Sequence, residues 1–286
     1  MKSVKRKEMN MERRRTICIA NQKGGVGKTT TAFNFAVELT KRNYDVLLVD
    51  FDSQGNLTKS TGITEGKNSD NCFLIKETIA GPLEKIMNDE EIAAPDIPIY
   101  ALKNQPNLKL IPCNVAMAKM KLKINLAMSR ESLLDRVIST VRNMFDYIII
   151  DTAPSLDVDM VNAFVAADEL IVTMTPDTFS ASGTYALIDT YAQVRKNLNH
   201  NLKIKGVLIT KVDARTNFAQ DMIDNIKSIW GKNVKIFGTV IPNSIKVQES
   251  QAAGVSIADY DKNNAAAKAY SLFTDEYLRN CNFINE

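Results

Sequence analysis

The sequence predicts an α/β protein whose mainly parallel, twisted sheet is covered by helices on both faces. Five short, almost wholly apolar runs are typical of strands buried on both sides, namely 16–20, 46–49, 145–150, 168–174 and 205–210. Stretches with helical spacing of apolar residues separate these runs. A glycine-rich turn follows the first run directly, at the edge of the sheet where such proteins bind ligands.

Helices are expected between and after these strands, over 29–41, 130–144, 157–166, 179–198, 218–230 and 264–279. In the first of them, Phe33, Ala36 and Val37 fall on one face, as a buried helical stripe requires. Residues 63–130 are less regular and rich in proline. We predict that they elaborate a single domain that spans residues 16–286.

The formal charge of +3 is concentrated at the N-terminus. Residues 1–15 carry seven lysines and arginines against two glutamates, a net +5, so the remaining chain is close to −2. A basic tail without apolar periodicity is predicted to be disordered, either as a solvated segment or as an electrostatic arm for DNA. Binding of nucleic acid by the folded part would need a local basic patch.

Composition and cysteine spacing argue against several classes of protein. The apolar run at 147–150 is far too short to cross a bilayer, and no apolar stretch follows the basic N-terminus as it would in a secretory signal. The four cysteines are scattered and form no Cys-x-x-Cys pair. This spacing argues against a zinc or disulfide framework and suits a reducing cytoplasm.

The turn after the first strand has the composition of a phosphate-binding loop. It reads KGGVGKTT over 23–30, between a predicted strand and a predicted helix. Its glycines allow backbone amides to curl around phosphate oxygens, and the helix adds its positive N-terminal end. Lys28 is expected to contact the β- and γ-phosphates of ATP, and the Thr29 hydroxyl to ligate Mg²⁺. The predicted ATP-binding residues of the loop are Lys23, Gly24, Gly25, Val26, Gly27, Lys28, Thr29 and Thr30.

Aspartates follow two of the predicted strands near this loop. Asp151 comes after the run at 147–150, where a carboxylate can hold Mg²⁺ through a water molecule. Asp50 and Asp52 follow the run at 46–49. Either of the two could orient the water that attacks the γ-phosphate.

With these motifs the chain resembles the ParA/Soj family of deviant Walker-A partition ATPases, which are P-loop NTPases of the SIMIBI type. The matching segments are KGGVGKTT at 23–30, VLLVDFDSQGN at 46–56, YIIIDTAPS at 147–155, GVLITKVDARTN at 206–217 and TVIPNSIKVQES at 239–250. The resemblance implies a slow, partner-stimulated ATPase that uses ATP and Mg²⁺ and works as an ATP-bound homodimer. It also favours Asp52 over Asp50 as the catalytic aspartate.

The resemblance gives a role to the second lysine of the loop. Lys23 matches the signature lysine that reaches across a sandwich dimer to the partner's phosphates, so the implied catalytic set is Lys23, Lys28 and Asp52. Two facing nucleotides bring many negative charges together, so a lysine supplied in trans would couple dimerisation to ATP. After hydrolysis this bridge weakens and the dimer should separate. Asp157, Asp159 and the loop at 176–183 are predicted to lie in switch or dimer-contact segments.

The family also implies partners and further contacts. Arg215 and Lys246 match its basic DNA-contact positions and are expected to meet phosphates of double-stranded DNA without regard to sequence. Pro242 and Ser244 occupy positions that border the adenine, in IPNS where relatives have IPRN. A ParB-type centromere-binding protein is the implied activator of hydrolysis. The implied location is cytoplasmic and nucleoid-associated, and the implied task is to position a plasmid or chromosome origin.

Two other functions of related ATPases would require different sequence features. A MinD-like ATPase that acts on a membrane would need a basic amphipathic C-terminal helix, whereas Asp275, Glu276 and Glu286 outnumber Arg279 here, so no membrane partner is expected. A relative that holds an iron–sulfur cluster would need suitably placed cysteines, which the DTAPS segment lacks. A polar-positioning ATPase acting on a protein-complex cargo shares the motifs above, and the sequence does not separate it from partition.

Overall fold

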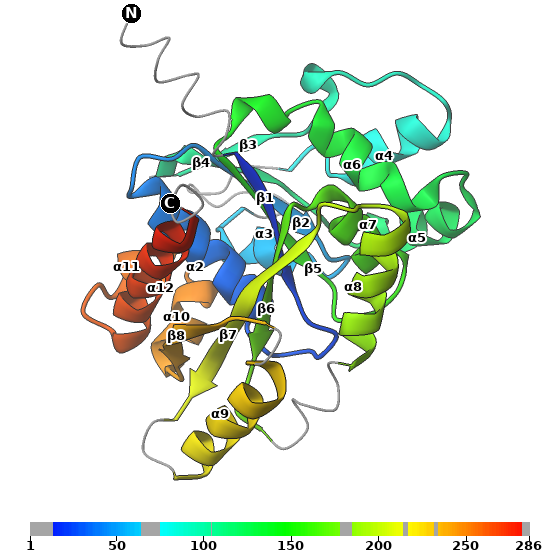
Figure 1. Cartoon of the computed structure of the whole chain (residues 1–286). Coiled ribbons are helices and arrows are strands. Elements are labelled where there is room, and N and C mark those ends of the chain that lie inside the picture. Colours follow the sequence, from blue (N-terminus) through cyan, green and yellow to red (C-terminus); the bar gives the residue numbers. More distant parts are fainter. Residues whose placement is uncertain are drawn as a thin grey trace, which may run out of the picture.

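A computed structural model describes residues 14–63, 75–103, 105–177, 185–213, 217–231 and 234–281. Within these ranges the strands form one eight-stranded sheet in the order β3-β4-β2-β5-β1-β6-β7-β8 (Figure 1). Their bounds are β1 Arg15–Ala20, β2 Val46–Phe51, β3 Tyr100–Leu102, β4 Gln105–Ile111, β5 Tyr147–Thr152, β6 Glu169–Met174, β7 Lys203–Val212 and β8 Ile236–Pro242. Neighbouring strands are parallel except β3 with β4, so the predicted fold class is confirmed.

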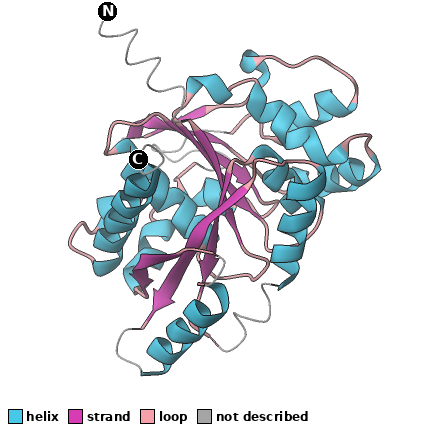
Figure 2. Cartoon of the chain, viewed as in Figure 1, coloured by secondary structure: helices cyan, strands magenta, loops and turns pink. Residues whose placement is uncertain are grey.

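Helices cover both faces of this sheet (Figure 2). One face carries α2 Lys28–Thr40, α3 Asn56–Ser60, α10 Ile245–Ala252, α11 Ile257–Tyr260 and α12 Ala265–Cys281. The other carries α4 Ala80–Met87, α5 Ala116–Leu126, α6 Leu133–Ser139, α7 Val158–Ala166, α8 Tyr185–Asn197 and α9 Asn217–Trp230. Three short 3₁₀ turns complete the described elements: η1 Ala94–Asp96, η2 Arg130–Ser132 and η3 Arg142–Met144.

The two apolar cores follow from the alternation of side chains along each strand. In β1, Cys18 and Ala20 pack into the core beneath α6 and α7, whereas Ile17 and Ile19 pack into the core beneath α2 and α12. A strand buried in this way has no polar face. The central strands therefore stand out in the sequence as uninterrupted apolar runs.

Three strands of the sheet, β3, β4 and β8, were not among the five predicted runs. β3 is only three residues long. β4 begins with Gln105 and Pro106 and is only partly buried, and β8 is an edge strand in which Gly238 is exposed. A search for wholly apolar runs does not detect strands of mixed burial. The helix predicted over 130–144 was also too long, because α6 covers only its middle and 3₁₀ turns flank it.

The exposed edge of the sheet at β8 is capped by a carboxylate. The register between β7 and β8 shifts between Val207 and Ile209, which indicates a bulge. Glu276 of α12 accepts hydrogen bonds from the backbone amides of Gly238 at 2.8 Å and Thr239 at 2.9 Å. These amides are thus unavailable to a foreign strand, which is one way that proteins protect sheet edges.

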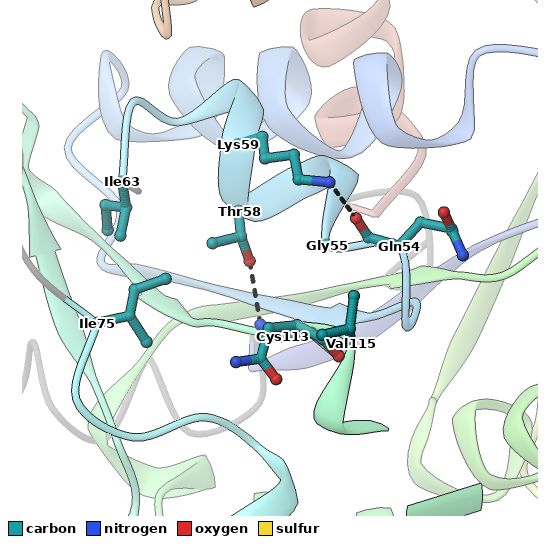
Figure 3. Close-up of a pocket in the computed structure, with 9 residues that line it drawn as sticks. Gln54, Gly55, Thr58, Lys59, Ile63, Ile75, Cys113 and Val115 are labelled. Carbon is teal, nitrogen blue, oxygen red and sulfur yellow. Dashed lines mark hydrogen bonds between the residues drawn. The ribbon is translucent and has the colours of Figure 1, made fainter. Parts of the chain in front are cut away.

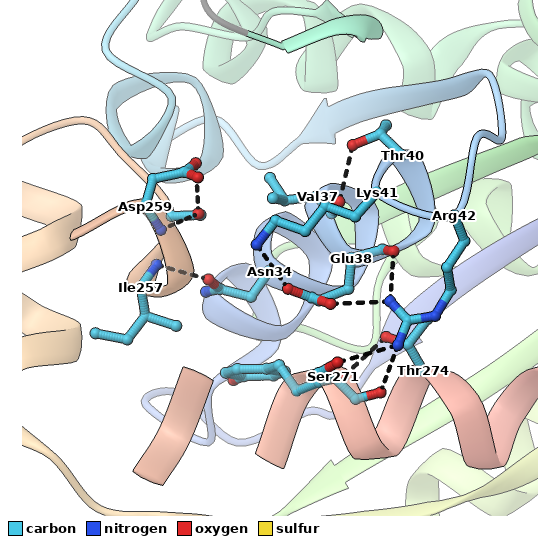
Figure 4. Close-up of polar contacts among 12 residues, drawn as sticks. Asn34, Val37, Glu38, Thr40, Lys41, Arg42, Ile257, Asp259, Ser271 and Thr274 are labelled. Carbon is cyan, nitrogen blue, oxygen red and sulfur yellow. Dashed lines mark hydrogen bonds and ion pairs between the residues drawn. The ribbon is translucent and has the colours of Figure 1, made fainter. Parts of the chain in front are cut away.

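A polar cluster joins α2, the helix after the phosphate loop, to α12 (Figure 4). The guanidinium of Arg42 lies 2.9 Å from Glu38 and 2.7 Å from Asp275, and it donates to the carbonyl oxygen of Ser271 at 3.0 Å. Charge-assisted bonds of this kind hold the two helices in one register. In the described ranges, none of the helices is both long enough and apolar enough to cross a membrane.

Candidate nucleotide-binding site

The predicted phosphate loop connects β1 to α2 at the C-terminal edge of the sheet. Gly25 and Gly27 have φ values of 75° and 80°, a left-handed conformation that favours glycine. The Asn21 side chain fixes the loop, because its Nδ2 donates to the carbonyl oxygen of Thr173 at 2.6 Å and its Oδ1 accepts from the amide of Lys23 at 2.9 Å. A loop held in this way needs little reordering to bind an anion.

Lys28 is the first residue of α2 and lies buried among carboxylates. Its Nζ donates to the carbonyl oxygen of Lys23 at 3.1 Å, so the ammonium folds back over its own loop. Burial lowers the pKa of Lys28, and the negative charges of Asp151 and Asp52 oppose that shift. A bound phosphate would offer this ammonium a stronger, charged acceptor than the backbone carbonyl.

Asp151 lies in β5 and is fully buried, with neither carboxylate oxygen hydrogen-bonded to a described residue. Burial and the charge of Asp50 raise the pKa of Asp151 to about 8, although the Thr29 hydroxyl and the Lys28 ammonium lie near enough to oppose this. A buried carboxylate whose oxygens lack well-formed hydrogen bonds is costly, and a metal ion bound beside Thr29 would offset that cost. Thr29 and Asp151 therefore fit the Mg²⁺ site predicted from the sequence.

No three acidic, histidine or cysteine side chains among the described residues converge closely enough to hold a metal alone. Mg²⁺ keeps several waters and takes oxygen ligands from nucleotide phosphates, so one hydroxyl and one carboxylate acting through water suffice for such a site. Thr29 and Asp151 thus offer the ligands expected for a metal ion that binds together with a nucleotide.

The two aspartates at the end of β2 differ in their hydrogen bonds. Asp50 is fully buried, and its Oδ2 accepts from the amide of Thr58 at 2.8 Å and from the Thr58 hydroxyl at 2.7 Å. Burial raises the pKa of Asp50 to about 6, and the bonds from Thr58 oppose the shift. Asp52 Oδ1 accepts from the amide of Gln54 at 2.9 Å, while its Oδ2 has no hydrogen-bond partner among the described residues. Asp50 therefore anchors α3, and Asp52 retains an acceptor for water.

Lys23, the second lysine of the loop, extends away from Lys28 toward the end of β6. Its Nζ lies 2.6 Å from Oδ2 of Asp177, and the two side chains are 41% and 34% exposed. Asp177 belongs to the loop predicted to contact a second subunit, whose residues 178–183 lie outside the described ranges. This ion pair was not predicted from the sequence.

Pro242 and Ser244, predicted to border the adenine, line a cavity of about 60 Å³ beside the phosphate loop. Gly27 and Thr30 of the loop line the same cavity, so the structure brings these predicted residues together. Gln251 of α10 also lines it, and its Nε2 donates to the Thr30 hydroxyl at 3.0 Å. α10 is therefore joined directly to the residues that would surround a nucleotide.

Only one of the two predicted DNA contacts lies within the described residues. Arg215 lies outside them. Lys246 lies in the first turn of α10, with its Nζ 2.6 Å from Oδ2 of Asp261. A DNA phosphate would have to compete with this aspartate for the lysine.

Sequence reasoning missed two polar residues that support the site from distant positions. The Thr210 hydroxyl donates to the carbonyl oxygen of Val26 in the loop at 2.8 Å. Lys121 of α5 bonds to Asp157 and lies 2.9 Å from Asp159, at the start of α7. A polar residue near the end of an apolar run is a signal that could have indicated Thr210, but nothing in the irregular segment before 130 singles out Lys121.

Residues 14–204 match a protein family described as an AAA domain. The chain is 34% identical over 264 residues to the sporulation initiation inhibitor protein Soj of Bacillus subtilis, covering 92% of this chain and 98% of that protein. It is 31% identical over 266 residues to the chromosome partitioning protein ParA of Caulobacter vibrioides, with 92% and 94% covered.

A solved structure agrees with these sequence relatives. Cobyrinic acid a,c-diamide synthase from Mycobacterium smegmatis, with bound ADP and magnesium, superposes with a TM-score of 0.75 at 28% identity. The match covers 93% of this chain and 94% of that one. The same fold thus holds a nucleotide and magnesium in that protein.

Proposed function

Because the chain belongs to the ParA/Soj family of deviant Walker-A ATPases, we propose that it is a DNA-partition ATPase. In this proposal, ATP and Mg²⁺ bind at the phosphate loop and two copies then associate face to face. The dimer holds DNA without regard to sequence, and hydrolysis, stimulated by a ParB-type centromere-binding partner, releases it. The observation that carries the proposal is the loop with two lysines of different placement: Lys28 is buried among carboxylates, and Lys23 extends out of the site.

The chemistry within one subunit is assigned to residues around the loop. The loop amides and Lys28 bind the phosphates, and the free acceptor of Asp52 orients the attacking water toward the γ-phosphate. Thr29 and, through water, Asp151 would hold Mg²⁺, which supplies charge neutralisation of the phosphates when bound. Pro242 and Ser244 would border the base.

The chemistry between subunits is assigned to Lys23. In the dimer its ammonium would leave Asp177 and neutralise phosphates bound to the other copy. Loss of the γ-phosphate removes charge that this lysine needs, so the dimer should separate after hydrolysis. Coupling of DNA affinity to the ATP state would then position a plasmid or chromosome origin.

The proposal is tested by measuring mass and DNA retention of the purified chain. With Mg²⁺ and a non-hydrolysable ATP analogue we expect a dimer that retains random-sequence duplex at low salt and loses it as salt rises. Arg215→Glu should preserve the dimer and abolish retention, whereas Lys23→Ala should abolish both. A dimer without affinity for DNA, or binding to anionic vesicles in its place, would instead favour an ATPase that positions another cargo.

A further inference from the structure

Helix α5 carries apolar side chains on both its inner and its outer face. Met117, Met120 and Ile124 are buried against the core, as expected for a helix that covers a sheet. On the outer face, however, Leu122 is 70% exposed and Leu126 is 89% exposed. A helix that is apolar on its solvent side usually has a partner that covers it.

The exposed positions follow a regular spacing. Val115, Lys119, Leu122 and Leu126 are separated by four, three and four residues, which places them in one row along the outer face. We call this row the α5 ridge. Its spacing is that of the a and d positions of two heptads, the pattern with which one helix packs along another. The ridge thus has the shape expected of one half of a two-helix contact.

The charge around the ridge selects the kind of helix that would fit. Residues 115–129 contain three lysines and no acidic residue. Lys119 lies within the ridge and makes no hydrogen bond or ion pair with a described residue, and Lys123 beside it pairs with Glu84 at the surface. A docked helix therefore needs apolar residues along one stripe and carboxylates beside it.

An apolar pocket adjoins the start of the ridge (Figure 3). Val115 forms part of its wall together with Ile63, Ile75 and the methylene-bearing side chain of Lys59, and its volume is about 280 Å³. Pockets of this kind hold the anchor side chain of a bound peptide, which contributes a large share of the binding energy. The ridge and the pocket together could hold a helix and one large side chain at its end.

The inner side of the same helix is connected to the nucleotide site. Lys121 bonds to Asp157, the N-cap residue of α7, and lies 2.9 Å from the buried carboxylate of Asp159. The segment that ends in Asp157 starts at Asp151, the predicted Mg²⁺ ligand. A shift of α5 would therefore displace Asp157 and the segment that connects it to Asp151.

We propose that the α5 ridge docks an acidic amphipathic helix of a partner protein, and that Lys121 transmits its binding to the nucleotide site. A second copy of the chain fits less well, because pairing two ridges would bring two Lys119 ammonium groups together at one seam. A bilayer surface also fits less well, because the ridge is one side chain wide and adjoins a pocket suited to a single anchor. The coupling through Lys121 rests on the proposed ATPase function, whereas the docking does not.

Docking is tested with a synthetic, helix-stapled peptide of about three heptads, with leucine at a and d and glutamate at e and g. We expect saturable binding to the full chain by fluorescence anisotropy, with slowed amide exchange over 115–128. Leu122→Glu should weaken binding at least about tenfold, as for a central contact residue. Leu272→Glu changes a leucine that is 57% exposed on α12, over the other face of the sheet, and should have no effect.

Several outcomes would overturn the docking proposal. They are no binding of the acidic peptide, equal binding of a peptide with lysine in place of glutamate, or binding that Leu122→Glu leaves unchanged. Sedimentation and vesicle flotation test the other occupants. Self-association, or binding to anionic vesicles, that Leu122→Glu abolishes would assign the ridge to a second copy or to a lipid surface.

The coupling is tested by the rate of ATP hydrolysis with the peptide bound. We expect the peptide to change this rate at least about twofold in the parent chain and in Leu272→Glu. In Lys121→Met the peptide should still bind, but the rate of hydrolysis should stay the same with and without it. Thermal unfolding of Lys121→Met checks that the fold is intact. A response that persists without Lys121 would refute the coupling, and absence of hydrolysis in every chain would refute the proposed ATPase while leaving the binding result intact.

Discussion

Lys23 and Asp177 form an ion pair beside the phosphate loop, with Lys23 Nζ 2.6 Å from Asp177 Oδ2. The Thr175 hydroxyl donates to the same carboxylate oxygen at 2.5 Å, which orients the aspartate. Under the proposed function, this ammonium must reach a nucleotide bound to another subunit. While it is paired with Asp177 the ammonium is held on its own subunit, so the ion pair competes with dimerisation.

Asp177→Asn should therefore make dimerisation easier. Half-exposed ion pairs contribute at most about 1 kcal/mol, so the dissociation constant of the dimer should fall by about two- to fivefold. The measurement is sedimentation equilibrium with Mg²⁺ and a non-hydrolysable ATP analogue. Lys23→Ala in the Asp177→Asn background should remain monomeric, and weaker dimerisation of Asp177→Asn itself would show that Asp177 supports the interface instead.

Lys28→Ala should remove nucleotide binding, because the variant leaves buried Asp151 and Asp52 without their neighbouring cation. We expect the affinity for ATP to fall by at least about 100-fold, since charge-assisted bonds to phosphate are lost. Calorimetric titration gives this value directly. Lys41→Ala, at the far end of α2, is the matched control and should bind ATP as the parent does. Unchanged affinity in Lys28→Ala would contradict the assignment of the loop.

The buried carboxyls predict how stability varies with pH in the nucleotide-free chain. The pKa of Asp151 is raised to about 8 and that of Asp50 to about 6, both above the usual value of about 4. Between the unfolded and folded pKa values the folded state binds more protons, so these groups lower the free energy of unfolding as pH rises from about 4 to about 8. Each group contributes up to about 1.4 kcal/mol per pH unit.

Urea unfolding at several pH values between 5 and 8 measures this dependence. Asp151→Asn cannot titrate, so its free energy of unfolding should fall less steeply with pH than that of the parent. Asp224→Asn is the matched control, because Asp224 is an exposed acid on α9, away from the loop, and its replacement should leave the slope close to that of the parent. Equal slopes in the parent and in Asp151→Asn would contradict a raised pKa at this position.

The elements at the centre of the fold could be predicted because their burial and backbone geometry restrict which residue types occur there. β1 and β5 are buried on both faces and appear as apolar runs, and the loop glycines follow from the backbone that a phosphate requires. Short motifs therefore led to Lys28, Thr29 and Asp151, which the structure brings together. Edge strand β8 could not be recognised in this way, because only two of its residues are buried and its register with β7 shifts.

Contacts between distant residues could not be predicted in the same way. Gln251 reaches Thr30, and Asp177 reaches Lys23, only because the chain folds back over many residues. A polar residue on a helix or loop has many possible partners, and its spacing in sequence does not select one. The pairing of Lys246 with Asp261 is of the same kind.

Asp50 and Asp52 should respond differently to replacement by alanine. Asp50→Ala leaves the buried amide and hydroxyl of Thr58 without an acceptor, so the free energy of unfolding should fall by about 2–4 kcal/mol. Asp52→Ala should change the free energy of unfolding by less than about 1 kcal/mol, because the Asp52 carboxylate accepts a single hydrogen bond, from Gln54. The same variant should hydrolyse ATP at least about 100-fold more slowly and should remain an ATP-bound dimer. Hydrolysis that survives in Asp52→Ala would move the role to another acceptor.

The ion pair between Lys246 and Asp261 predicts that DNA affinity can be increased. Asp261→Asn frees a lysine whose Nζ lies 2.6 Å from the carboxylate, so retention of random duplex by the ATP-bound dimer should rise by about two- to fivefold. Lys246→Glu should weaken retention and reduce the salt slope by about one, as expected when one phosphate contact is lost.

The matched control for this pair lies on the other face of the sheet. Lys85 and Asp96 form a similar surface ion pair at 2.7 Å, and Asp96→Asn should leave DNA retention unchanged. Filter binding across a range of salt concentrations gives both the affinity and the slope. If Asp261→Asn and Asp96→Asn increase retention equally, the gain comes from net charge, and Lys246 does not contact DNA.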